Sequence, residues 1–170
     1  AKNTLKGLNG VFNMSAGKFD SYGANASLNY KTGKFNFFTN SGYRDNTDMG
    51  GAFQDNRYSN NNTYDQFVET RSFERRRQGT NVNIGLDFSL TNKTKITLSY
   101  VQNTRDGDDQ TRNDQNHFLA TTTITKSLRS EIEEDFDLNK QLSLSLTHKF
   151  NEKGHKLDVI LQGERNIEDE

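Results

Sequence analysis

The sequence predicts an all-β protein, built as an antiparallel up-and-down meander of about seven strands. Two independent patterns predict this fold. Apolar and polar residues alternate along seven segments, as they do in strands that bury one face. The connections between these segments alternate between short turns and long polar stretches, which is typical of consecutive hairpins in one sheet.

The composition first has to be distinguished from that of a disordered chain. Only 30% of the 170 residues are hydrophobic, and the mean hydropathy is -0.99. Three features argue against disorder: a net charge of only -1, an aromatic content of 11% and the complete absence of proline. The composition therefore indicates a β-rich chain with long polar connections.

The first three segments lie between residues 8 and 44 of the sequence. Each places its larger or more apolar residues on one side, opposite Asn, Ser and other polar residues. The apolar sides consist of Leu8, Gly10, Phe12, Met14 and Ala16, then Ala24, Ala26, Leu28 and Tyr30, then Phe35, Phe37, Thr39, Ser41 and Tyr43.

The last four segments lie between residues 81 and 162. The sixth keeps one parity over a long span that only Lys140 and His148 interrupt. The apolar sides consist of Val82, Ile84, Leu86, Phe88 and Leu90, then Ile96, Leu98 and Tyr100, then Phe136, Leu138, Leu142, Leu144, Leu146 and Phe150, then Leu157, Val159 and Leu161.

The connections predict which ends of the strands lie together. Four-residue turns are expected at 31–34, 91–94 and 151–154, and long polar loops at approximately 45–80 and 104–135. In an up-and-down sheet all the short turns then lie at one end and the long loops at the other. Outer-membrane barrels have this asymmetry, with short periplasmic turns and long extracellular loops.

The apolar sides allow two interpretations. They pack against a second sheet in a soluble sandwich, or they face lipid in a transmembrane β-barrel. Strand length and two unusually long loops favour the barrel, as do aromatic residues near the strand ends, where interfacial girdles occur. These aromatic residues are Tyr30, Phe35, Tyr43, Tyr100, Phe136 and Phe150.

Several classes of protein are excluded by the sequence. No apolar run approaches the roughly 20 residues of a membrane-spanning helix, so a helical membrane protein is excluded. Cysteine is absent, so there is no disulfide framework and no thiolate metal site. A pI near 6.4 gives no overall attraction to nucleic acid, and no nucleic-acid partner is expected.

Three stretches carry a family resemblance. The hairpins at 28–44 and 146–159 read LNYKTGKFNFFTNSGYR and LTHKFNEKGHKLDV, and the opening at 2–17 reads KNTLKGLNGVFNMSAG. The two hairpins resemble the early barrel hairpins of Bacteroidetes-type outer-membrane β-barrel proteins related to TonB-dependent receptors. The opening resembles the stretch in that family where the chain leaves the plug domain and enters the first barrel strand. The resemblance extends over nearly the whole chain.

The resemblance implies a larger barrel of about 22 strands with a plug domain in its lumen. Residues 1–170 are then expected to be a partial barrel, a fragment that contains early strands but no plug domain. The implied function is uptake of an unknown ligand across the bacterial outer membrane. The implied partners are outer-membrane lipid, the rest of the barrel, the plug, an inner-membrane energy-coupling complex and a surface lipoprotein. A barrel that serves as the scaffold of a surface assembly and a soluble adhesin-like binding module are the alternatives.

One basic cluster is a candidate for binding an anionic ligand, because guanidinium groups recognise phosphate and carboxylate in a bidentate manner. It consists of Arg71, Arg75, Arg76 and Arg77, placed in the predicted loop at 45–80 or at its mouth. The alternative interpretation is a solvated loop face with neighbouring glutamates.

Other chemistry finds little support in the sequence. Asp106, Asp108 and Asp109 are oxygen ligands of the kind that calcium prefers, but their spacing fits an acidic loop tip better than an EF-hand. The three histidines, His117, His148 and His155, lack the spacing of metal ligands. No Ser, His and Asp grouping indicates an enzyme, and no metal or cofactor is expected.

Overall fold

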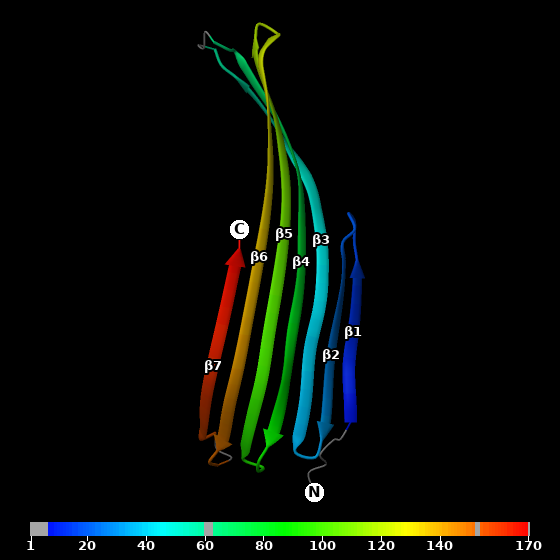
Figure 1. Ribbon diagram of the computed structural model, residues 1–170, viewed down its shortest axis with the longest axis vertical. Coiled ribbons are helices and arrows are strands. Elements are labelled where there is room, and N and C mark those ends of the chain that lie inside the picture. The colour runs from blue at the N-terminus through cyan, green and yellow to red at the C-terminus, as the bar shows by residue number, and fades with distance from the viewer. Residues whose placement is uncertain (1–6, 60–62, 152–153, 170) are drawn as a thin grey trace.

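The computed structural model describes residues 7–59, 63–151 and 154–169, which form one antiparallel sheet of seven strands in chain order (Figure 1). Each strand pairs with the next one along the chain, so the predicted all-β meander is confirmed. The sheet is open, with the first and last strands at its two edges. The strands are β1 (Gly7–Ala16), β2 (Tyr22–Thr32), β3 (Phe35–Arg57), β4 (Gln66–Ser89), β5 (Thr94–Leu119), β6 (Thr122–Lys149) and β7 (Lys156–Asp169).

The short turns between β2 and β3 and between β4 and β5 lie together at one end of the sheet (Figure 1). The prediction that all short turns lie at this end is wrong, because the two-residue turn between β5 and β6 lies at the opposite end. The turn between β2 and β3 is tighter than expected, because Thr32 already pairs with Phe35 and only Gly33 and Lys34 lie between them. Gly33 has a φ of 57°, a left-handed conformation that glycine adopts without steric cost. The predicted turn at 151–154 lies partly outside the described residues.

The structure corrects the two long loops predicted at 45–80 and 104–135. Most of these residues continue the strands: β3 extends to Arg57, β4 begins at Gln66, and β5 and β6 are separated only by Ala120 and Thr121. Figure 1 shows the four strands extending far beyond β1, β2 and β7. Their polar residues have no apolar period to reveal a strand, yet they satisfy their backbone groups by pairing with their neighbours.

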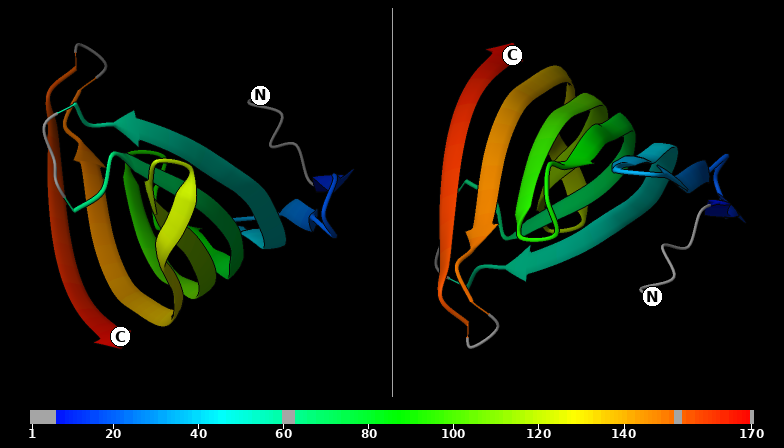
Figure 2. Two further views of the ribbon diagram at one scale, coloured as in Figure 1. Left: turned by 90° about the horizontal axis from the view of Figure 1, so that it is seen from above. Right: turned by 90° about the horizontal axis from the view of Figure 1, so that it is seen from below.

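In the part of the sheet that contains all seven strands, one face carries an apolar band that crosses every strand. The clearest row of register partners in this band runs through Leu8, Tyr30, Phe37, Leu86, Leu98, Leu144 and Leu161. Among the described residues no hydrophobic side chain is buried, and the sheet has no second layer over this face. Figure 2 views the sheet from its two ends and shows that it is a single layer, twisted and curved.

The opposite face of the sheet is mostly polar. A row of register partners there is made almost entirely of asparagine: Asn13, Asn25, Gly42, Asn81, Asn103, Asn139 and Asn166. The ring of Phe38 lies on this face over Gly85, where an added Cβ would be 2.2 Å from the ring atom Cζ. Glycine therefore leaves the space that this aromatic ring occupies.

Within the part of the chain that the structure describes, no helix has the length and apolar character needed to cross a membrane.

We expect Gly85→Ala to lower the free energy of unfolding by about 1–3 kcal/mol, because the added methyl group overlaps the Phe38 ring. The measurement is the free energy of unfolding of the folded chain by denaturant titration. Gly163→Ala is the matched control, since no atom lies within 4 Å of the Cβ that it adds. In a Phe38→Ala background the cost of Gly85→Ala should largely disappear; an unchanged cost would contradict the steric explanation.

Candidate functional site

The four candidate arginines lie within β4 and not in a loop. Alternation along the strand separates them: Arg71, Arg75 and Arg77 share the polar face, whereas Arg76 lies on the face that carries the apolar band lower down. The cluster seen in the sequence is therefore two groups on opposite sides of the sheet.

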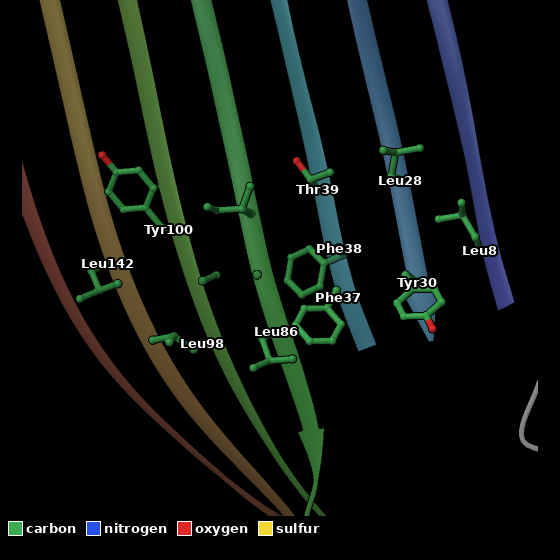
Figure 3. Close-up of a pocket in the computed structure, with 13 residues that line it drawn as sticks. Leu8, Leu28, Tyr30, Phe37, Phe38, Thr39, Leu86, Leu98, Tyr100 and Leu142 are labelled. Atoms are coloured by element: carbon green, nitrogen blue, oxygen red, sulfur yellow. The ribbon is translucent and has the colours of Figure 1, made fainter. Parts of the chain in front are cut away.

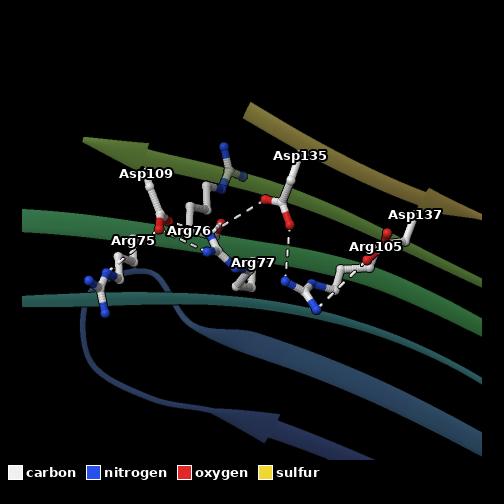
Figure 4. A network of polar contacts seen from close by, with 7 residues as sticks. All are labelled: Arg75, Arg76, Arg77, Arg105, Asp109, Asp135 and Asp137. Atoms are coloured by element: carbon white, nitrogen blue, oxygen red, sulfur yellow. Dashed lines mark hydrogen bonds and ion pairs between the residues drawn. The ribbon is translucent and has the colours of Figure 1, made fainter. Parts of the chain in front are cut away.

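On the polar face, arginines and aspartates form a chain of ion pairs across three strands (Figure 4). Arg77 of β4 forms a bidentate pair with Asp109 of β5, and Arg75 lies 3.6 Å from the same carboxylate. Arg105 of β5 lies 3.0 Å from Asp135 of β6. Arg77 also approaches Asp135 at 4.0 Å, which joins the two halves of the chain.

The remaining members of this chain extend it along β6. Arg105 lies 3.7 Å from Asp137, two residues beyond Asp135 on the same face. The guanidinium of Arg77 lowers the pKa of Asp109 by donating hydrogen bonds to its ionised form. The charges therefore neutralise one another between neighbouring strands, which stabilises the extended part of the sheet.

On the other face, Arg76 pairs with the most buried side chain of the described residues, Asp45 at 1% exposure. Arg76 donates to the two carboxylate oxygens of Asp45 at 3.1 and 2.7 Å, and Gln78 donates to Oδ2 at 2.9 Å. The hydrogen bonds from Arg76 lower the pKa of Asp45 to about 2, against an ordinary value of 3.8. Tyr43 also directs its hydroxyl at Oδ2, 3.4 Å away.

The fourth candidate, Arg71, donates a hydrogen bond from Nε to Oδ1 of Asn113 at 3.0 Å. Asn113 is only 4% exposed. All four candidate arginines thus have partners within the sheet, and an anionic ligand would have to share them with those partners. Ligand binding by Arg71, Arg75, Arg76 and Arg77 stays a prediction.

The acidic and histidine candidates are dispersed. Asp106 and Asp108 lie on the face opposite Asp109, in the middle of β5 and not at a loop tip. His117 packs against the ring of Tyr64 at 4.7 Å between ring centres. His148 accepts or donates a hydrogen bond at 2.9 Å with Thr94. Among the described residues, no three His, Cys, Asp or Glu side chains are grouped so that they could hold a metal ion.

The apolar face contains a shallow hollow that the sequence analysis did not identify (Figure 3). It has a volume of about 490 Å³ and collects residues from β1 to β6. Its lining includes Leu8, Leu28, Phe37, Leu98, Tyr100 and Leu142. Pairing of β5 with β6 brings Tyr100 and Leu142 together, and only the register between strands could have revealed this.

The chain matches no protein-family model and no curated protein.

We expect stability to fall as the pH drops from about 4 toward 2, because Asp45 is then protonated. Its pKa is lower in the folded chain than in the unfolded chain, so its contribution is complete above the unfolded value of 3.8 and is lost below it. Asp45→Asn should remove about 2 kcal/mol at neutral pH, which is typical of hydrogen bonds to a charged group, and should flatten the acid dependence.

The measurement is the free energy of unfolding of the chain as a function of pH. Asp48→Asn is the matched control, because Asp48 is exposed, lies in the same strand and has no ion pair within the described residues. An equal loss in both variants would show that net charge, not the Arg76 pair, sets the acid stability.

Proposed function

We propose that the chain forms part of the wall of an outer-membrane β-barrel receptor that takes up a ligand with TonB-dependent energy coupling. The observation that carries this proposal is the apolar band across all seven strands, which nothing covers within the described residues. In water such a face would be a strong aggregation surface, whereas in a bilayer it is the surface that lipid requires.

Aromatic side chains at both borders of the band support a membrane position. At the turn end, Phe35 stacks on Phe88 with ring centres 4.9 Å apart. At the other border, the ring centres of Tyr22 and Tyr43 lie 6.0 Å apart, and the hydroxyl of Tyr43 points toward the carboxylate of Asp45. Aromatic rings with polar groups on the water side are typical of membrane interfaces.

Strand length supports an extension outside the membrane. A tilted strand needs about 9–11 residues to cross a bilayer, whereas β5 has 26 and β6 has 28. The additional residues carry the ion pairs described above, and only scattered apolar side chains, such as Met49, Phe53 and Ile132, lie among the polar residues there. The four-stranded extension of β3 to β6 is then the extracellular part of the chain and the first surface that a ligand meets.

The transport role rests on the family resemblance of the hairpins at 28–44 and 146–159. In this proposal the asparagine-rich face lines the lumen and faces a plug domain, and the energy-coupling complex of the inner membrane acts on that plug. The rest of the barrel closes the sheet at β1 and β7. A surface lipoprotein is a further proposed partner at the extracellular side.

Single tryptophan residues test which face contacts lipid, because the chain contains no Trp. Leu98 and Ser99 are neighbours in β5 on opposite faces of the sheet. In vesicles whose acyl chains carry bromine, we expect fluorescence of Leu98→Trp to be quenched severalfold more than that of the matched control Ser99→Trp. Heavy-atom quenching requires contact with the acyl chains, and unfolded chains would show no difference between the variants.

Absence of quenching at both positions in vesicle-bound protein would contradict the membrane proposal and favour a soluble sandwich. Quenching at Ser99→Trp alone would place the polar face against lipid and contradict it as well. Full-length protein that extracts only with detergent and keeps a compact form in SDS until it is heated would support the barrel. Loss of ligand uptake on removal of the energy-coupling complex would separate a transporter from a scaffold.

A further inference from the structure

Two basic residues lie side by side on the face that carries the apolar band. Lys140 of β6 and Arg165 of β7 are register partners, and both are exposed. Leu138 and Ile167 form the next pair in one direction on this face, and Leu142 lies in the other direction. A basic pair flanked by apolar residues on both sides differs from the ordinary polar border of a sheet.

No carboxylate neutralises this pair within the described residues. Neither Lys140 nor Arg165 belongs to any of the ion pairs there. The closest acids on the same face of β5 and β7 are Asp106 and Asp169, four residues further along the strands or roughly 13 Å away. Like charges directly opposite each other in a sheet repel, so an external anion would be stabilising here.

A third donor lies beside the two cations. Gln102 of β5 is the register partner of Lys140 on the same face. Its Oε1 accepts a hydrogen bond from the hydroxyl of Tyr100 at 2.7 Å, which leaves the amide N–H groups of Gln102 as donors. An ammonium, a guanidinium and an amide in one row across three strands suit the oxygens of a phosphate group.

The apolar hollow begins next to this row. Leu142 and Tyr100 line the hollow. Leu142 lies two residues from Lys140 in β6, and Tyr100 lies two residues from Gln102 in β5. A molecule with a phosphate at Lys140 and Arg165 can therefore place an acyl chain along the hollow toward Leu98. Long basic side chains on the lipid-facing side of a barrel are tolerated where their charged ends reach the interface.

We infer that Lys140, Arg165 and Gln102 bind the phosphate of an anionic membrane lipid whose acyl chain occupies the hollow beneath them. This inference rests on the proposed membrane function. It assigns the basic pair a ligand of a stated class, an anionic lipid whose phosphate has no cationic group of its own. The arginines of β4 are paired with aspartate or asparagine and are not part of this site.

The test measures association of the chain with vesicles of phosphatidylcholine alone and of phosphatidylcholine with phosphatidic acid as the minor component. The site variant is Lys140→Gln with Arg165→Gln. The matched control is Lys149→Gln with Lys156→Gln, which removes two charges from register partners in the same strands but on the opposite face, at the turn end.

We expect phosphatidic acid to strengthen association of the unchanged chain about tenfold, as two basic groups near an anionic lipid allow. The site variant should lose most of this increase and should still associate with phosphatidylcholine, whereas the control should retain the increase. An increase that survives in the site variant, or that is lost equally in the control, would overturn the inference. Failure of the unchanged chain to associate with either vesicle would overturn the proposed membrane function instead.

Discussion

The in-register antiparallel ladder between neighbouring strands is the constraint on which the rest of the structure depends. Because every strand pairs with the next one along the chain, a period of two in each segment becomes a continuous face across the sheet. A shift of one residue between any two strands would move leucines into the asparagine row and break both faces. The apolar band, the hollow and the pair of Lys140 and Arg165 all follow from this register, because each combines residues from two or more strands.

In the extension of β3 to β6 beyond the apolar band, ion pairs between neighbouring strands stabilise the sheet in place of apolar contacts. Arg77, Asp109, Arg105 and Asp135 connect β4, β5 and β6 on one face, while Arg76 and Asp45 connect β4 and β3 on the other. Exposed ion pairs contribute little individually, but these are shared and partly shielded, and they accompany an unbroken ladder of backbone hydrogen bonds. The sheet can therefore continue beyond the apolar band. The Lys140 and Arg165 pair differs from these arginines because no carboxylate pairs with it within the described residues.

The sequence predicted the strands well where one side is continuously apolar and poorly where apolar residues are only scattered. The alternation from Asn81 to Leu90 reveals the lower half of β4, whereas its upper half, which contains Arg71 and Arg75 to Arg77, was predicted to be loop. No local period distinguishes a polar strand from a polar loop, because the difference lies in the partner strand. For the same reason the four arginines resembled one basic cluster, although their alternation within a strand sends Arg76 to the opposite face.

By itself the sequence determined the all-β class, the number and order of the strands and the parity of each apolar side. These properties are local, because hydrophobic alternation and turn residues depend only on neighbours along the chain. Only the tertiary structure decided that β3 to β6 extend as one paired unit, that Asp45 is buried beside Arg76 and that Lys140 meets Arg165. Those features need the register between strands, which no single strand specifies where it has no continuous apolar side.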